Sequence, residues 1–277
     1  MQTFSDGWYT ASNIKEGVWA IDDNGQDNFY AVLGKERSLM IDTGFGAGDL
    51  GALTQKLSHK PWFAVNTHCD FDHCLGNDFF NTVYIGPGDI DTLNNTNPEL
   101  IRKRLWIDPE INKTDRNWGP GVELGGTRAK QKTLLLEDGQ SFDLGGRTVT
   151  AYHIPGHSVG SMCFIDDKSR TCFMGDMYVP LQEWNELWCH MDRCTSVAVI
   201  LNSINRVRGL KSKFDLIVSG HGSNYALEAG RLDEFAEGLE GIVSGRIVGE
   251  PVETVVGPGY AVRFNHVGII YNPNKIV

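Results

Sequence analysis

Residues 66–73 read Asn66-Thr67-His68-Cys69-Asp70-Phe71-Asp72-His73 and follow the apolar run Trp62-Phe63-Ala64-Val65. The stretch places two imidazoles and two carboxylates within six residues. A short apolar run between turn signals predicts a buried strand, and the loop that follows a strand can hold functional side chains. Histidine and carboxylate side chains are the ligands of many metal sites, so this octet indicates a metal site. The alternative interpretation is a polar turn that happens to contain two histidines.

Four further segments set a polar side chain beside a glycine at the end of an apolar run. A lone histidine in such a place is most often a structural residue, but several of them together with the octet favour a metal centre over coincidence. The segments are Ile41-Asp42-Thr43-Gly44, Pro155-Gly156-His157-Ser158, Met174-Gly175-Asp176-Met177 and Ser219-Gly220-His221-Gly222.

The order of these motifs resembles the metallo-β-lactamase superfamily. Asp-Thr-Gly at 42–44 is followed by Thr-His-x-x-x-Asp-His at 67–73, Gly-His at 156–157, Gly-Asp at 175–176 and Gly-His at 220–221. The resemblance covers the chain from about residue 15 to about residue 225 and implies an α/β fold, a four-layer αββα sandwich. The family's usual motif is His-x-His-x-Asp-His, and Asp70 stands here in place of the middle histidine.

The resemblance also implies a centre of two divalent ions that share a water molecule as hydroxide, the nucleophile of a hydrolase. Asp72 is in addition the candidate proton shuttle, and Asp42 is implied as a hydrogen-bond partner that orients a ligand. The implied ligands are His68, Asp70 and His157 on one ion, Asp72, His73 and His221 on the other, and Asp176 between them.

Asp70 bears on which metal the centre holds. A carboxylate in place of an imidazole adds negative charge and shifts preference from zinc toward harder ions such as iron or manganese. We expect zinc first, iron or manganese second, and a pair of ions rather than one.

The bulk composition limits the class of protein. The chain has 277 residues, of which 41% are hydrophobic, and this suits one metallo-β-lactamase-like domain over residues 1–277. A net charge of -10 argues against a nucleic-acid partner. No apolar run has the length of a membrane span, and residues 1–13 lack the features of a signal peptide. The six cysteines are not needed as disulfide staples in a chain of this length, and we expect a cytoplasmic location.

Apolar patterns predict the order of strands and helices. The expected helices cover 49–59, with Asp49 as N-cap, 197–210 and 225–243. Residues 87–132 are irregular and rich in Asn, Gly, Pro and charge, so we interpret them as an insertion over the site with one helical piece at 98–106. Alternation and turn signals predict strands at 17–21, 28–33, 38–41, 62–65, 83–85, 134–136, 140–142, 148–154, 161–165, 171–174 and 214–218, and a final strand pair at 260–271.

The segment from Met177 to His190 is rich in aromatic residues and follows Asp176, so it is a candidate for the mouth of a substrate pocket. Tyr178 is the candidate donor of a hydrogen bond to a substrate oxyanion. The alternative is that Trp184 and Trp188, four residues apart, form one packed face of a helical turn. An aromatic pocket favours a small, uncharged and partly apolar ester, thioester or lactone.

Two other functions compete with hydrolysis. A mononuclear iron dioxygenase on the same fold could use two histidines and one carboxylate, supplied by His68, His157 and Asp176. A non-catalytic domain, in which Asp70 has disabled the first metal site, is the third interpretation.

Overall fold

The computed structural model describes residues 2–96, 101, 132–180, 185–222, 226–227, 229–254 and 256–277. The chain divides into two compact units, called unit 1 (residues 1–85, 90–135 and 144–146) and unit 2 (residues 86–89, 136–143 and 147–277). The predicted insertion at 87–132 falls mostly outside the described residues, as does its helical piece at 98–106. The assignment of residues 1–277 to one domain stays a prediction.

Unit 1 contains an eight-stranded sheet in which sequential strands are neighbours throughout. The first five strands pair antiparallel, and the pairs β5–β6, β6–β7 and β7–β8 are parallel. Parallel neighbours require crossover connections, and the helices of this unit lie in them. The strands are β1 (Thr3–Ser5), β2 (Tyr9–Lys15), β3 (Val18–Asp23), β4 (Asn28–Leu33), β5 (Ser38–Ile41), β6 (Trp62–Val65), β7 (Thr82–Ile85) and β8 (Lys132–Leu135).

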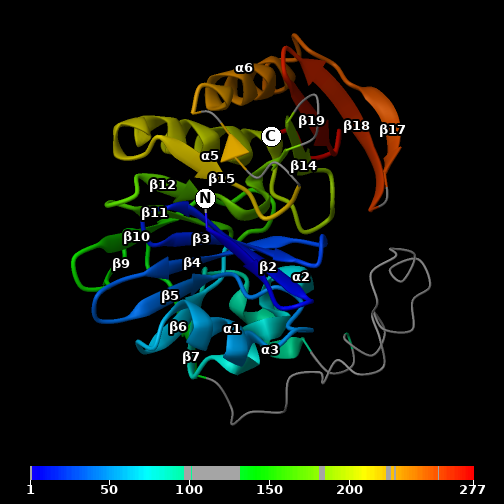
Figure 1. Ribbon diagram of the computed structural model, residues 1–277. Helices are drawn as coiled ribbons and strands as arrows, with labels where there is room; N and C mark the ends of the chain where they lie inside the picture. The colour runs from blue at the N-terminus through cyan, green and yellow to red at the C-terminus, as the bar shows by residue number, and fades with distance from the viewer. Residues whose placement is uncertain are drawn as a thin grey trace. The chain divides into compact units, whose positions relative to one another are not determined.

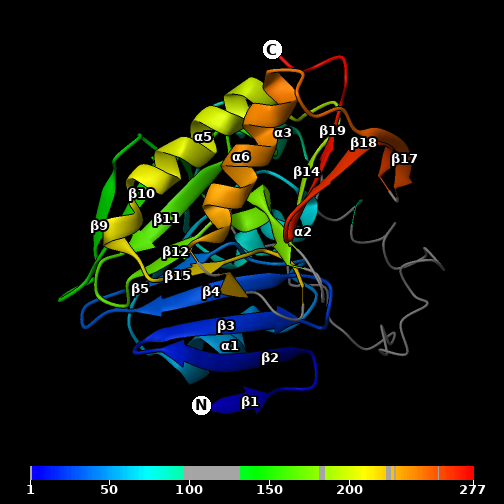
Figure 2. The same cartoon turned by 90° about the horizontal axis from the view of Figure 1, so that it is seen from above.

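Helix α1 (Leu50–Leu57) connects β5 to β6 and lies against the sheet in Figures 1 and 2. It begins as predicted at Asp49, whose side chain accepts a hydrogen bond from the Ala52 amide at 2.8 Å. Leu50 and Leu53 are buried in a core that includes Phe29 of β4. The other described helices of this unit are α2 (Phe71–Cys74), α3 (Ile90–Asn95) and the 3-10 helix η1 (Leu75–Phe79).

Unit 2 contains a six-stranded sheet ordered β16-β15-β12-β11-β10-β9, in which β12 and β15 are parallel neighbours. Helices α5 (Val197–Gly209) and α6 (Arg231–Val243) pack against each other and cover one face of this sheet in both views (Figures 1 and 2). The strands are β9 (Ser141–Asp143), β10 (Thr148–His153), β11 (Met162–Asp166), β12 (Thr171–Phe173), β15 (Leu216–Val218) and β16 (Ala226–Leu227).

A second sheet of unit 2 has five strands in the order β13-β14-β19-β18-β17. Its centre is the parallel pair β14–β19, which joins segments about 80 residues apart in the sequence, such as Leu187 and Ile269. The strands are β13 (Val179–Pro180), β14 (Asn185–Cys189), β17 (Glu250–Thr254), β18 (Gly257–Phe264) and β19 (Val267–Tyr271).

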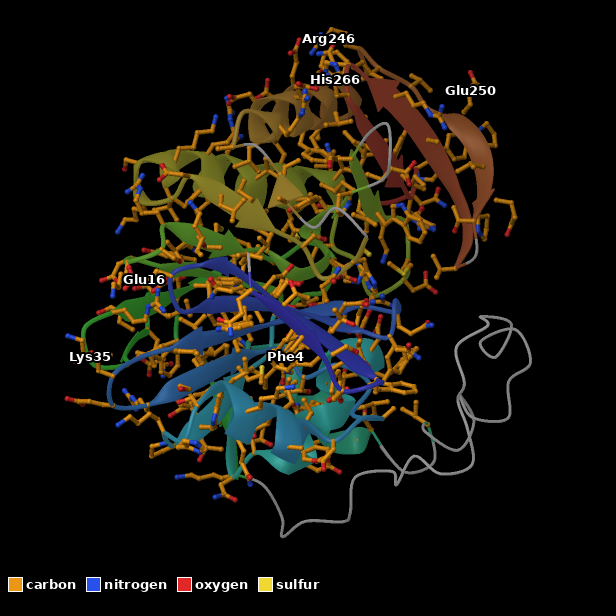
Figure 3. The ribbon with its side chains drawn as sticks, viewed as in Figure 1. Phe4, Glu16, Lys35, Arg246, Glu250 and His266 are labelled. Atoms are coloured by element: carbon orange, nitrogen blue, oxygen red, sulfur yellow. The ribbon has the colours of Figure 1, made fainter. Side chains whose placement is uncertain are left out.

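Most predicted elements are found in the described residues, and the differences fall on weakly patterned segments. Strands β1 and β2 were not predicted, because the polar sequence of β2 hides its buried residues Tyr9 and Ala11. Phe4 of β1, labelled in Figure 3, is held by the Trp19 ring at 5.7 Å and by the Lys56 ammonium. All six cysteines are buried thiols that form no disulfide. Among the described helices, none combines the length and apolar character needed to cross a membrane.

Candidate metal centre

In unit 1 the ends of two parallel strands bring the first group of polar residues together. Ile41 of β5 lies beside Val65 of β6, so Asp42 and the octet leave the sheet at the same edge. The Asp42 amide donates to the Val65 carbonyl at 2.9 Å, and Asp42 adopts a left-handed φ of 61°. A left-handed conformation is costly for a residue other than glycine, so the surrounding hydrogen bonds must hold it.

Asp42 is the acceptor around which this group is built. Its Oδ1 accepts from the Thr67 amide at 2.7 Å, and its Oδ2 accepts from the Thr67 hydroxyl at 2.7 Å and lies 3.2 Å from His73 Nδ1. His68 Nδ1 lies 2.9 Å from the Thr67 oxygen, which has already donated its proton to Asp42. These bonds place a proton on Nδ1 of both histidines and leave the Nε2 lone pairs to bind a cation.

Buried amides fix the backbone of the short helix that carries Asp72 and His73. The Asn66 side-chain amide donates to the His73 carbonyl at 3.1 Å, and the Asn77 amide donates to Asn66 Oδ1 at 2.8 Å. The Thr43 amide also donates to the His73 carbonyl, at 2.9 Å. Hydrogen bonds therefore hold His73 at its backbone and at Nδ1. Its Nε2 is the ring nitrogen whose lone pair can bind a metal ion.

The spacing of the donor atoms in unit 1 fits a divalent cation. His68 Nε2 lies 3.4 Å from Asp70 Oδ2, and His73 Nε2 lies 3.6 Å from Asp72 Oδ2. Two ligands bound at about 2.1 Å with tetrahedral angles are about 3.4 Å apart. In each pair a nitrogen lone pair faces a carboxylate oxygen, an arrangement that a bound cation would stabilise.

In unit 2 a second pair of parallel strands positions Asp176 and His221. Phe173 of β12 lies beside Val218 of β15, and the Gly220 amide donates to the Gly175 carbonyl at 3.1 Å. Asp176 lies in the 3-10 helix η3 (Gly175–Met177) that follows β12, and His221 follows β15. Both residues therefore leave the sheet at one edge, as their strand-end motifs predicted.

His157 joins these two residues from the loop after β10. Asp176 Oδ2 lies 3.1 Å from His221 Nε2 and 3.9 Å from His157 Nε2. The loop passes so close to Met177 that a Cβ atom on Gly156 would lie 2.6 Å from its sulfur. One carboxylate oxygen facing two imidazole nitrogens makes these three residues a candidate cation-binding group of unit 2.

Comparison with known proteins identifies the family. The family model described as the metallo-β-lactamase superfamily matches residues 22–221. The chain belongs to the metallo-β-lactamase superfamily. A crystal structure of an archaeal superfamily protein from Sulfolobus tokodaii covers 80% of this chain and 85% of its own, with a TM-score of 0.55 at 18% identity. The predicted metallo-β-lactamase fold is confirmed.

Relatives within the superfamily carry the names of thioesterases. The human acyl-coenzyme A thioesterase MBLAC2 is 31% identical over 191 residues, which cover 61% of this chain and 66% of that protein. The atrochrysone carboxyl ACP thioesterase of Aspergillus fumigatus is 29% identical over 181 residues, or 62% of this chain and 34% of that protein. The chain thus spans less than two thirds of the length of either relative.

Sequence reasoning missed a buried carboxylate that supports the superfamily's Gly-His loop. Asp89, 3% exposed, accepts from the Ser158 hydroxyl at 2.7 Å and from the Gly160 amide at 2.9 Å. A Cβ atom on Gly160 would lie 2.5 Å from the Asp89 carboxyl carbon. Asp89 therefore fixes the residue after His157. The signal that could have drawn notice was the turn Gly86-Pro87-Gly88 before it.

The structure contradicts the helical alternative for the aromatic segment, and the place of this segment at a pocket mouth stays a prediction. Trp184 lies outside the described residues, and Trp188 lies on strand β14 rather than on a helical turn. The Tyr178 side chain is 1% exposed in the apolar core of unit 2, where burial raises the pKa of its hydroxyl. This position favours a packing role over the predicted hydrogen bond to substrate. His190, 4% exposed, lies 2.9 Å from the Thr254 hydroxyl.

Proposed function

We propose that this chain is a metal-dependent hydrolase that cleaves thioesters of small acyl groups. The observation that carries the proposal is the arrangement of donors within each unit, where imidazole Nε2 atoms face carboxylate oxygens at 3.1 to 3.9 Å. Membership of the superfamily supports metal dependence. The choice of thioesters over the esters and lactones also expected from the sequence rests on the names of two relatives.

The proposed centre binds two divalent ions, with zinc as the first candidate. All seven predicted ligands are candidate metal-binding residues. Asp70 makes one ion's ligand set richer in carboxylate, so iron or manganese is the second candidate. The proposed ligands are His68, Asp70 and His157 for one ion, Asp72, His73 and His221 for the other, and Asp176 for both.

Hydrolysis of a thioester adds water to the carbonyl carbon, breaks the carbon–sulfur bond and releases a carboxylic acid and a thiol. The bound ions would supply a water molecule of lowered pKa and polarise the carbonyl oxygen. The chain's part is to hold the imidazoles in the Nδ1-protonated form through Asp42 and Thr67. Asp72, whose side chain is 19% exposed, is the proposed proton carrier toward the leaving sulfur.

The first test measures metal content and activity on the same preparation. Protein purified without added metal is analysed for zinc, iron and manganese, and is then assayed against acyl thioesters, esters and lactones and for oxygen uptake. We expect about two ions per chain and a higher kcat/KM for thioesters than for the corresponding esters. One iron with oxygen uptake would instead support the dioxygenase, and a metal-free inactive chain would support the non-catalytic domain.

Matched variants separate a ligand from a histidine that merely stabilises the fold. His73→Ala and His157→Ala are expected to lose bound metal and at least 100-fold in kcat/KM. His59→Ala removes an exposed imidazole and is the control. Thioester hydrolysis that survives both ligand substitutions, or that survives complete removal of metal, would refute the proposal. A cytoplasmic location stays a prediction that cell fractionation tests.

A further inference from the structure

A second histidine lies at the base of the loop that carries His157. This loop, called the histidine loop (residues 154–161), connects β10 to β11, and His153 is the last residue of β10. The ring of His153 reaches across the loop, where its Nε2 lies 2.9 Å from the carbonyl oxygen of Val159. A carbonyl oxygen only accepts hydrogen bonds, so Nε2 of His153 is the donor. The bond therefore links the start of the histidine loop to the second residue after His157.

A pair of charged side chains holds the main chain of His153. Asp138 Oδ1 accepts from the His153 amide at 2.9 Å, and Arg206 Nη1 donates to the His153 carbonyl at 3.0 Å. The two side chains also bind each other, since Arg206 Nη2 lies 2.8 Å from Asp138 Oδ1 and 2.7 Å from Oδ2. His153 therefore has a fixed backbone, from which its ring can hold the histidine loop.

The residue that His153 binds gains little from packing. Val159 is 54% exposed, so apolar contacts contribute little to its position. Asp89 binds the residues on either side of it, accepting from the Ser158 hydroxyl at 2.7 Å and from the Gly160 amide at 2.9 Å. With the bond from His153, three successive residues after His157 are held by hydrogen bonds. These bonds restrict the backbone from which the His157 ring projects.

We propose that His153 is a positioning residue, which holds the histidine loop so that the His157 imidazole is in place to bind a metal ion. The inference rests on the proposed function, in which His157 is a ligand. A ligand that is already in place loses less conformational freedom when the metal binds, so fixing the loop raises metal affinity. Loss of a partner that supports a metal ligand typically weakens metal binding about 10- to 100-fold. Because His153 acts on the loop and not on the His157 ring, we expect the lower end of that range.

The test uses two variants of His153 that differ in the hydrogen-bond donor. His153→Gln keeps an N–H donor near the position of Nε2, whereas His153→Phe keeps a ring without a donor. His266→Ala, which removes an exposed imidazole of unit 2 (Figure 3), is the first control. Ile242→Val is the second, since it removes a methyl group from the core of unit 2 and lowers stability without changing the hydrogen bonds of the histidine loop.

Zinc affinity is measured for each protein by competition with a chelator. We expect His153→Phe to weaken zinc binding about tenfold and His153→Gln to weaken it less than about threefold, while both controls match wild type. At saturating zinc, the loss of thioester hydrolysis in His153→Phe should lie in kcat with KM nearly unchanged, because His157 binds metal rather than substrate. Unchanged affinity in His153→Phe would refute the inference. Equal losses in His153→Phe and His153→Gln, or in Ile242→Val, would also refute it, since the effect would then not depend on the donor.

Hydrogen exchange in the metal-free protein keeps this inference separate from the proposed function. The Gly156 amide donates to the Ser158 carbonyl and the Gly160 amide donates to Asp89, both at 2.9 Å, so both amides report on the histidine loop. In His153→Phe these amides should exchange about fivefold faster than in wild type and His153→Gln, with β12 unchanged. That result would support the inference even if no thioester is hydrolysed. Equal exchange in the three proteins, or faster exchange throughout the sheet, would overturn it even if the wild type proves to be a thioesterase.

Discussion

Replacing Asp23 by asparagine should remove a large part of the pH dependence of folding. Asp23 ends strand β3 with no exposed surface, and its oxygens accept from Trp8 Nε1 at 2.5 Å and from the Phe45 amide at 2.7 Å. Burial raises the pKa of this carboxyl from 3.8 to about 7, although the two hydrogen bonds act in the opposite direction. The folded protein therefore holds this proton up to a higher pH than the unfolded chain does.

The order of these two pKa values decides whether folding stability rises or falls with pH. Because the folded pKa lies above the unfolded one, stability is lost as pH rises from about 4 to about 7, with a total near 4 kcal/mol. Between pH 5 and pH 8 the corresponding loss is about 2.5 kcal/mol. Asparagine does not titrate, so the stability of the wild type relative to Asp23→Asn should fall by this amount over the same interval.

Urea denaturation of both proteins at pH 5, 6, 7 and 8 measures that difference. Placing the asparagine amide beside two donors has a free-energy cost that does not change with pH. This cost therefore does not affect how the stability difference between the two proteins varies with pH. The control is Asp49→Asn, which removes an exposed carboxylate while keeping an effective N-cap for α1. If the wild type and Asp23→Asn keep a constant difference across the four pH values, Asp23 is ionised throughout and the argument from burial is refuted.

Three further substitutions test other parts of the structure. Asp42→Asn should retain the far-UV circular dichroism of the wild type but weaken zinc binding about 10- to 100-fold in a chelator competition, because His73 Nδ1 loses its charged acceptor; unchanged affinity would contradict this. Asp89→Ala should cost about 2–4 kcal/mol in urea denaturation, with Asp89→Asn costing less, since two buried donors lose a charged acceptor. Arg147→Met should cost about 3–5 kcal/mol by leaving the buried Asp166 carboxylate without its cationic partner at 2.9 Å, and adding Asp166→Leu should recover much of that loss.

The strand ends were predictable from sequence because two local signals coincide there. Apolar runs such as Trp62–Val65 identify buried strands, and the polar residues that follow them identify where the strands end. Parallel pairing then brings the ends of β5 and β6 to one edge, which is why Asp42 meets Thr67. The family resemblance supplied the αββα layer architecture, which the sequence pattern alone does not contain.

Other features depend on contacts between distant residues and leave no local signal. Strand β14 has alternating burial, but its partner β19 lies about 80 residues later. The four-residue spacing of Trp184 and Trp188 in the sequence was therefore open to a helical interpretation. Tyr178 follows a predicted ligand, yet only the packing of the core shows that its side chain is buried. The role of Asp89 was found only through the hydroxyl and the amide that donate to it.

Lys275 donates hydrogen bonds to the carbonyls of Asp192 and Cys194, in the loop before α5, across 83 and 81 positions of sequence. This separation has a consequence for biosynthesis. A ribosome makes the chain from its N-terminus, and early segments begin to fold before later ones exist. While Lys275 is still unmade, its ammonium cannot hold the loop that precedes α5. The nascent chain should therefore fix this loop only after Lys275 has been made, when all the proposed metal ligands are already present in the chain.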